Sequence, residues 1–293
     1  MAARRFRQQQ ATKNDDDLAS MVQSGPQGAY EALQLYRSRS IRLKNKSDIE
    51  GAMKSCTSGT VLLLENGYEN AAAELADFLL ELFAETGQPV GNETRGMLFT
   101  IADKFQSGSA HKVEFLKAAI KWSAEVGSRE GGDSALHTKL AECLWDTRDK
   151  NAANHFAQGE APGLYNEKIF ATFAGSSENE AREQACTIGI VNFLALENLR
   201  DAFELFRLYN AAAKEKGFPV SSSLLTFCDY LLQVSRRDAQ PLFKQLVNEY
   251  ASVVDFDEQV TTLLMGPIAA KLFGIKPKIN PMMSMLHSMM SSQ

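Results

Sequence analysis

The sequence has few of the features that mark membrane, secreted or nucleic-acid-binding proteins. Among its 293 residues, no apolar run exceeds about four residues (Val61–Leu64 is an example), whereas a helix needs about 20 to span a bilayer. Lys and Arg number 31 against 36 Asp and Glu, for a net charge of −5. This balance argues against a general nucleic-acid binder, because phosphate recognition requires excess positive charge. We therefore expect neither membrane insertion nor nucleic-acid binding.

Cysteines are also scarce, and they are widely spaced along the chain. There are four, and no two are separated by only two residues, the spacing typical of zinc and redox motifs. The N-terminal residues include cations but no apolar segment like that of a secretory signal. These features predict reduced, buried thiols and a location in the cytosol. The four residues are Cys56, Cys143, Cys186 and Cys228.

Familiar catalytic and cofactor-binding motifs are missing too. The sequence contains no P-loop, no dinucleotide-binding glycine motif, no His-Glu-x-x-His and no Gly-x-Ser-x-Gly. The run Asp15-Asp16-Asp17 leaves open an enzyme of the all-helical prenyltransferase kind. The same carboxylates are also favourable at the start of a helix, where the backbone dipole is positive. We predict no enzymatic activity, no cofactor and no metal.

What the sequence does contain is helical periodicity along most of its length. Apolar residues recur at i, i+3, i+4 and i+7, the spacing of one helix face. Ser47-x-x-Glu50 and Asp255-x-x-Glu258 are similar to capping boxes and predict helix starts, whereas Gly67, Gly87 and Gly217 predict helix ends. The pattern predicts an all-α protein of about fourteen helices. Examples of the stripe are Leu75/Phe78/Leu79/Leu82/Phe83 and Leu224/Phe227/Cys228/Leu231/Leu232.

Helix pairs recur about every 40 residues, the period of α-solenoids such as TPR-like or HEAT-like stacks of helical hairpins. The recurrence is marked by small residues, among them Ala32, Ala72, Ala153 and Ala202. We predict four parts: a flexible basic tail over 1–14, N-terminal repeats over 15–148, C-terminal repeats over 149–275, and a methionine-rich tail or capping helix over 276–293.

Charge is segregated along the N-terminal half. Residues 37–46 carry five cations and no acid, whereas residues 55–94 contain no Lys or Arg. Within the second region, Glu74, Asp77, Glu81 and Glu85 share one helix face. A solvated surface is the ordinary explanation. Opposite stripes on adjacent helices also favour a bipolar surface that orients a charged protein partner.

Two features near the C-terminus bear on packing and binding. Pro267 lies inside an otherwise helical stretch, residues 260–273, and predicts a kink or break there. Beyond it, five apolar residues follow helical spacing and form what we call the methionine stripe. A methionine face can adapt to an irregular partner or cap the end of a solenoid. The stripe consists of Met282, Met285, Leu286, Met289 and Met290.

Several of these segments resemble the Golgi-to-ER traffic protein four family, the cytosolic scaffold of the guided-entry pathway for tail-anchored membrane proteins. The resemblance runs in order over about residues 20–290. The segments are Gly28-Ala-Tyr-Glu-Ala-Leu-Gln-Leu-Tyr-Arg37 with Arg42, Ala71-Ala-Ala-Glu-Leu75 with Leu79-Leu-Glu81, Ala119-Ile-Lys-Trp-Ser123, Leu136-His137 to Leu144-Trp145, Asn192-Phe-Leu-Ala-Leu196, and Lys271-Leu-Phe-Gly274 before Pro277-Lys278.

The resemblance implies a non-catalytic α-solenoid with two docking regions. The N-terminal half would bind the homodimeric targeting ATPase that carries tail-anchored proteins. The residues matching the family's ATPase face are Tyr30, Arg37, Arg42 and Glu74, the last standing where relatives commonly have aspartate.

The C-terminal half would bind an adaptor with a ubiquitin-like domain, which links to a co-chaperone. The matching loop is Lys214-Glu-Lys-Gly-Phe-Pro-Val-Ser221, so we assign adaptor binding to Phe218, Pro219 and Val220, together with Met282, Met285 and Leu286 of the methionine stripe. The alternative interpretation is a helical-repeat scaffold subunit of another assembly, such as a proteasome-lid-like complex.

Overall fold

The computed structural model describes residues 15–275, and this part of the chain is helical without strands. It forms fifteen helices when α16, the π-helical turn η2 and α17 are counted as one and the short 3-10 turn η1 is left out. The all-α prediction is confirmed. The elements are α2 (Asp15–Gln23), α3 (Pro26–Asn45), α4 (Ile49–Glu65), α5 (Glu69–Glu85), α6 (Asn92–Ala102), α7 (Ala110–Val126), α8 (Ser134–Asp146), α9 (Ala152–Gln158), α10 (Pro162–Thr172), η1 (Ser176–Glu178), α11 (Asn179–Ala195), α12 (Leu199–Glu215), α13 (Ser223–Arg236), α14 (Gln240–Glu249), α15 (Ala251–Val254), α16 (Glu258–Leu263), η2 (Leu264–Ile268) and α17 (Ala269–Phe273).

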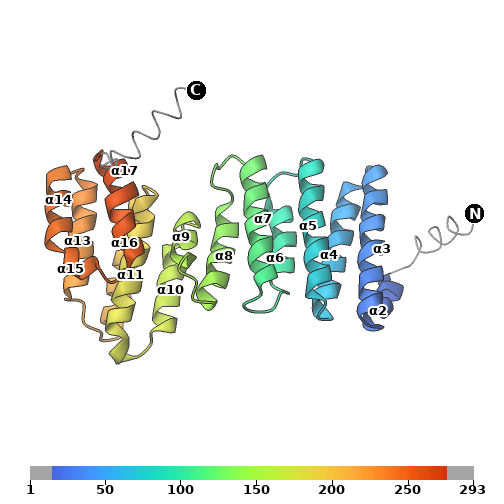
Figure 1. The fold of residues 1–293 in the computed structure, drawn as a ribbon, viewed down its shortest axis with the longest axis horizontal. Helices are drawn as coiled ribbons and strands as arrows, with labels where there is room; N and C mark the ends of the chain where they lie inside the picture. The colour runs from blue at the N-terminus through green and yellow to red at the C-terminus, as the bar shows by residue number, and fades with distance from the viewer. Residues whose placement is uncertain (1–14, 276–293) are drawn as a thin grey trace, which may run out of the picture. The chain divides into compact units, whose positions relative to one another are not determined.

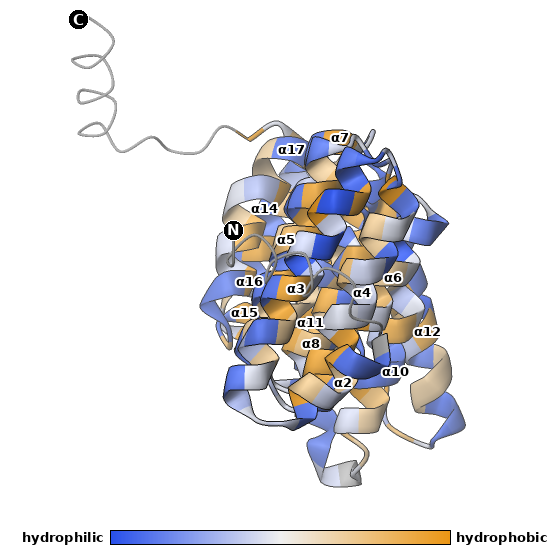
Figure 2. Cartoon of the chain, turned by 90° about the vertical axis from the view of Figure 1, so that its right-hand side faces the viewer, coloured by the Kyte–Doolittle hydropathy of each residue, from blue (hydrophilic) through white to orange (hydrophobic). Residues whose placement is uncertain are grey.

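The chain divides into two compact units, with the boundary between His155 and Phe156. Within each unit, consecutive helices pack as hairpins, as their alternating directions in Figure 1 show. The apolar stripes turn inward between the helices, and polar residues cover the outside (Figure 2). In α5, for example, Leu75, Leu79 and Phe83 are fully buried. Hydrophobic burial along each stripe is therefore the main force that holds the helices together.

Polar contacts between neighbouring hairpins join residues about 40 positions apart. This separation confirms the period seen in the sequence, because equivalent helices of successive hairpins lie side by side. In unit 2, Thr187 and Cys228 are 41 positions apart and 3.2 Å from each other. In unit 1 the pairs are Arg37–Glu74, Lys44–Glu85, Glu65–Lys104, Asn70–His111 and Arg95–Asp133, with separations of 37, 41, 39, 41 and 38 residues.

Many helices end in the same turn, in which a left-handed residue lets the next N–H reach back five residues. At the end of α4, for example, Gly67 has φ 80° and the N–H of Tyr68 donates to the carbonyl of Leu63 at 2.9 Å. This is the Schellman arrangement, which satisfies carbonyls that a helix end leaves exposed. The predicted ends at Gly67, Gly87 and Gly217 are confirmed. Five further left-handed positions are not glycine: Ser47, Arg148, Glu160, Glu197 and Asp238.

Two predicted helix starts are displaced by one or two residues. The side chain that caps α4 is Asp48, which accepts from Gly51 N at 2.9 Å, and the cap of α16 is Asp257, which accepts from Gln259 N at 2.6 Å. Ser47 instead occupies the left-handed position that ends α3. In both cases the capping carboxylate belongs to an aspartate one or two residues after the expected residue, where the local turn brings it to the free N–H groups of the helix.

The predicted irregularity at Pro267 is confirmed. Proline lacks the N–H that an α-helix needs, and the backbone responds with the π-helical turn η2 between α16 and α17. The axis therefore continues through a widened turn instead of breaking. The predicted basic tail over 1–14 and the segment 276–293 lie outside the described residues.

Candidate protein-binding surfaces

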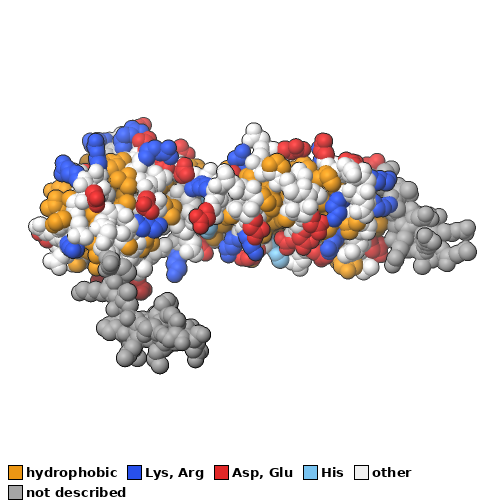
Figure 3. Space-filling view, turned by 90° about the horizontal axis from the view of Figure 1, so that it is seen from above, with side chains coloured by type: hydrophobic (Ala, Val, Ile, Leu, Met, Phe, Trp, Pro, Cys, Tyr) orange, Lys and Arg blue, Asp and Glu red, His pale blue; other side chains and the backbone are white. Residues whose placement is uncertain are grey.

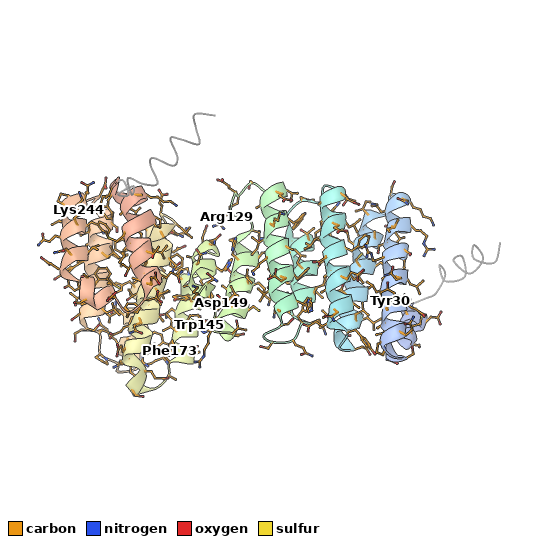
Figure 4. All side chains as sticks on the ribbon, viewed as in Figure 1. Tyr30, Arg129, Trp145, Asp149, Phe173 and Lys244 are labelled. Atoms are coloured by element: carbon orange, nitrogen blue, oxygen red, sulfur yellow. The ribbon has the colours of Figure 1, made fainter. Side chains whose placement is uncertain are left out.

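Tyr30 is the most exposed of the predicted ATPase-binding residues. It lies on α3 (Figure 4), and its exposed fraction is 55% although the neighbouring Ala29 and Leu33 are buried. It borders a depression of about 420 Å³ between α3 and the start of α5. An exposed aromatic ring beside a depression is a typical anchor for a protein partner. The lining is Pro26, Ala29, Tyr30, Leu33, Gly67, Tyr68, Glu69, Asn70, Ala71 and Glu74.

Arg37 and Glu74 meet directly. The Arg37 Nη1 and Glu74 Oε1 atoms are 2.7 Å apart, and the guanidinium also lies over the Phe78 ring at 5.0 Å. The two side chains are 34% and 47% exposed. The structure thus brings two predicted site residues together as an ion pair between α3 and α5. The longer side chain of glutamate, compared with aspartate, fits this reach from α5 to α3.

The basic residues of α3 divide between two faces. Lys44 stands two turns beyond Arg37 on the same side, and its Nζ pairs with Glu85 at 2.6 Å. Arg39 and Arg42 lie around the helix from this row, because five residues correspond to a rotation of about 140°. The Arg42 Nε donates to the carbonyl of Ser38 at 3.2 Å. Some of the basic residues of α3 are therefore already paired with acidic residues of α5 within the molecule.

The acidic face of α5 continues toward α7. Burial raises the pKa of the Asp77 carboxyl, and the nearby Glu81 raises it further, while His111 on α7 opposes the shift. His111 itself is held by Asn70, 2.8 Å away. Figure 3 shows acidic side chains gathered over part of unit 1 with basic ones beside them. This face therefore presents concentrated negative charge beside the paired row of α3 and α5.

The second predicted site, the connection between α12 and α13, is an irregular loop. Phe218 is half-buried and stacks on Phe170 with ring centroids 6.4 Å apart. Pro219 next to it is exposed, and Val220 is half-buried. At the end of the loop, Ser222 caps α13 through Leu225 N at 3.1 Å. The loop is thus anchored by its aromatic ring and presents its proline outward.

A buried arginine that no sequence pattern indicated lies beneath this loop. Arg182 on α11 is fully buried, and its guanidinium carbon lies 3.7 Å from the centre of the Phe218 ring. Its Nη1 donates to the carbonyls of Phe173 and Gly175 at 2.5 and 2.6 Å, and its Nη2 donates to Asn179. No local sequence pattern distinguishes it, because these partners come from a separate segment and from a loop 36 residues further along. Arg182 therefore fixes the floor of the predicted adaptor site.

Glu183, next to this arginine, strengthens the same anchor. Its side chain is buried and hydrogen-bonds Ser222 at the far end of the loop. Burial raises the pKa of the Glu183 carboxyl, whereas Ser222 and Arg182 lower it. Arg182 and Glu183, adjacent on α11, thus contact the two ends of the loop, at Phe218 and Ser222. The other predicted adaptor residues, Met282, Met285 and Leu286, lie outside the described residues.

The remaining titratable groups of note are thiols and a histidine pair. The four cysteines are buried, and burial raises the pKa of Cys56 to about 11 and that of Cys228 to about 12. His137 and His155 lie with their Nδ1 atoms 2.9 Å apart and their rings stacked. Because the Nε2 of His137 faces the carbonyl of Gly131 at 2.8 Å and must donate there, its neutral Nδ1 accepts from His155.

Within residues 15–275, no group of three or more His, Cys, Asp or Glu side chains is arranged to hold a metal ion. No helix in that part of the chain is both long and apolar enough to cross a membrane. The two predicted surfaces consist of an exposed aromatic ring beside paired charges on unit 1 and an anchored loop on unit 2.

Comparisons with known proteins place the chain in a family. The chain is 27% identical to Protein GET4 of Arabidopsis thaliana over 303 residues, covering 92% of each protein. It is 28% identical to the Golgi to ER traffic protein 4 homolog of Homo sapiens over 255 residues, covering 85% of this chain and 76% of that protein. The crystal structure of C. therm. Get4 matches with a TM-score of 0.76 and 25% identity, over 94% of this chain and 93% of that one. A sequence model described as GET4, Golgi to ER traffic protein 4, matches residues 46–292. The chain therefore belongs to the Golgi to ER traffic protein 4 family, and its fold is an α-helical solenoid.

Proposed function

We propose that this protein is a non-catalytic cytosolic scaffold in the targeting of tail-anchored proteins to the ER membrane. Unit 1 docks the homodimeric targeting ATPase, and unit 2 holds a ubiquitin-like-domain adaptor that connects to a co-chaperone. Family membership over residues 46–292 is the observation that carries this proposal. Transfer of a tail-anchored protein is then promoted because both partners are held on one chain.

The ATPase surface is the α3–α5 face around Tyr30. An amphipathic aromatic beside a depression supplies contact area at a low cost in conformational entropy. The Arg37–Glu74 pair is ordered before binding, which reduces the entropy lost when a partner engages it. Arg42 adds positive charge on a neighbouring face of α3 and steers an acidic partner toward the surface.

The adaptor surface is the loop after α12. Its backbone is anchored by Phe218 and Ser222, so the exposed Pro219 is presented without a large ordering cost. A fixed loop suits a partner that docks in a single register.

Calorimetric titration of the purified ATPase into the purified chain tests the first contact. We expect Arg42→Glu to weaken binding by about 2–5 kcal/mol if the charge is desolvated in the complex, or mainly to slow association and change the salt dependence if it lies at the rim. Arg207→Glu, an exposed residue of unit 2, is the matched control and should bind normally. Unchanged affinity of Arg42→Glu at low salt, with normal helicity, would place the ATPase site elsewhere.

The adaptor contact has its own test. Pro219→Glu adds a charge to the exposed loop residue without touching the buried anchor, and should abolish capture of the adaptor while ATPase binding persists. Mass spectrometry of proteins bound to the unmodified chain in cytosol separates this role from that of another scaffold. Recovery of subunits of a different assembly, without the ATPase and adaptor, would support the alternative.

A further inference from the structure

A groove on unit 2 lies at the C-terminal end of the described chain. It has a volume of about 990 Å³ and is formed by α14, α15, α16, η2 and α17. Most of its lining is apolar, and Met265 at its edge is 58% exposed. We call it the terminal groove. Its apolar lining includes Phe243, Val247, Val254, Leu264, Met265 and Ile275. A cavity of this size and polarity is suited to apolar side chains.

The described chain ends inside this groove. Gly274 adopts φ 61°, and the N–H groups of Gly274 and Ile275 both turn back to the carbonyl of Ala269, the second at 2.9 Å. This turn stops α17 and makes Ile275 part of the groove wall. The chain that follows Ile275 therefore begins at the wall of the groove.

The sequence that follows has the composition to fill the groove. Residues 276–293 contain no Asp or Glu, and the methionine stripe places five apolar side chains on one side of a helical pattern. Residues 276–281 would reach at most about 20 Å if extended, and residues 282–290 would be about 13 Å long as a helix. Both lengths suit a return to a groove that begins at residue 275. Methionine adapts to irregular apolar walls.

We propose that residues 282–290 dock in the terminal groove of the same chain, with the methionine stripe against Val247, Leu264 and Met265. The short connection gives the segment an effective concentration on the order of millimolar, far above that of a second copy or a separate partner at micromolar concentration. This proposal does not depend on the proposed function. It assigns Met285 and Leu286 an intramolecular role in the free protein.

Paired substitutions in the full chain test the docking. Met285→Asp with Met289→Asp places two charges on the stripe, whereas Ser284→Asp with Ser288→Asp places the same charges on the opposite side. We expect the first pair to lower the melting temperature by about 4 °C or more relative to the second. Met265→Asp, at an exposed groove position, should lower it similarly, and combining it with the stripe pair should add little. Equal melting temperatures for the two pairs would overturn the proposal.

A labelled peptide with the sequence of residues 276–293 provides a second readout. It should bind the chain ended after Ile275, once circular dichroism shows that this shortened chain keeps the helicity of the full chain, with a Kd of about 0.1 mM or tighter. It should bind the full chain at least tenfold more weakly because the groove is filled. Equal binding to both chains, or binding to neither, would contradict intramolecular docking. A doubled mass of the full chain in light scattering, lost with the stripe pair, would assign the groove to a second copy instead.

Discussion

The two units stabilise their hairpin stacks by different polar means. In unit 1, neighbouring hairpins are linked by ion pairs at the surface, such as Arg37–Glu74 and Glu65–Lys104. Among the described residues, every buried Arg, Asp or Glu belongs to unit 2, where Arg182, Glu183 and Asp201 contact helix ends and loops.

This contrast bears on how each unit tolerates change. An exposed ion pair contributes about 0–1 kcal/mol and is screened by salt, whereas removal of one member of a buried charged network costs about 3–5 kcal/mol. Unit 1 can therefore exchange surface charge to suit a partner with little loss of stability. In unit 2, the buried charges of Arg182 and Glu183 hold the loop after α12 in place.

The strongest test of the contrast is Arg182→Met. Loss of the guanidinium leaves the carbonyls of Phe173 and Gly175 without their donor and Glu183 without its neighbouring positive charge, so we expect a loss of about 3–5 kcal/mol in the free energy of unfolding. Urea titration followed by circular dichroism measures it. Lys104→Met, at the surface pair with Glu65 in unit 1, should cost less than about 1 kcal/mol. Comparable costs would remove the distinction between the units.

Apolar packing should respond alike in both units. A methyl group on Gly59 would lie 2.5 Å from Cγ of Tyr36, and one on Gly189 would lie 2.2 Å from Cε1 of Tyr165. Both rings are buried. We expect Gly59→Ala and Gly189→Ala each to destabilise by about 1–3 kcal/mol in denaturant unfolding.

The matched control is Gly96→Ala. Nothing lies within 4 Å of a methyl group at this position in α6, so the helix should gain about 1 kcal/mol from the better helix former. A stabilising change at position 59 or 189 would mean that the hairpins do not approach as closely as the structure indicates.

Unit 1 also contains partly buried ionisable groups, the histidine pair His137 and His155. Burial lowers the pKa of His155 to about 4, with His137 and Lys117 adding to the effect and Asp149 opposing it. Burial also lowers the pKa of His137, and Arg129 adds to this, while Gly131 and Asp133 oppose it.

The unfolded chain therefore binds protons more readily at these two sites. Stability from the pair is complete above about pH 6.5 and falls as the pH decreases toward about 4. His155→Gln should flatten this part of the stability–pH curve, measured by thermal melting between pH 7 and 5. An unchanged slope would show that other groups determine it.

The smallest expected effect concerns the Arg37–Glu74 pair. Arg37→Glu places two carboxylates together and should cost about 1 kcal/mol or less at low salt, and the exchange Arg37→Glu with Glu74→Arg should restore that stability. ATPase affinity should remain reduced in the exchanged protein, because the partner meets reversed charges. Restored affinity together with restored stability would indicate that the pair only braces α3 against α5.

Sequence patterns were sufficient where the determining contacts are local. The helices, the period of about 40 residues and the irregularity at Pro267 each depend on residues within a few turns or on simple repetition. The capping residues were displaced by one or two positions because several acceptors stand together, as at Ser47 and Asp48. The left-handed helix ends at Arg148 and Glu197 were missed because glycine is the residue type that most readily adopts this conformation, so other residues at such positions are not recognised from sequence.

The candidate sites were predictable only in part, for the same reason. The positions of Tyr30 and Phe218 followed from similarity to a family. The pairing of Arg37 with Glu74 depends on the register of α3 against α5, which lies beyond any single helical pattern. The role of Arg182 depends on the backbone carbonyls of Phe173 and Gly175, a few residues before it, and on the ring of Phe218, 36 residues after it. Backbone carbonyls have no signature in a sequence, and the ring belongs to a distant segment.

The polar links spaced about 40 residues apart also bear on mechanical behaviour. Since each hairpin is held mainly by its neighbours, a chain pulled at its ends should give way one hairpin at a time instead of in a single rupture. Each step would release about 40 residues, on the order of 130 Å of extended chain. In unit 2 the segment braced by Arg182 should yield last. The protein would then lengthen in increments under load and still keep its remaining hairpins folded.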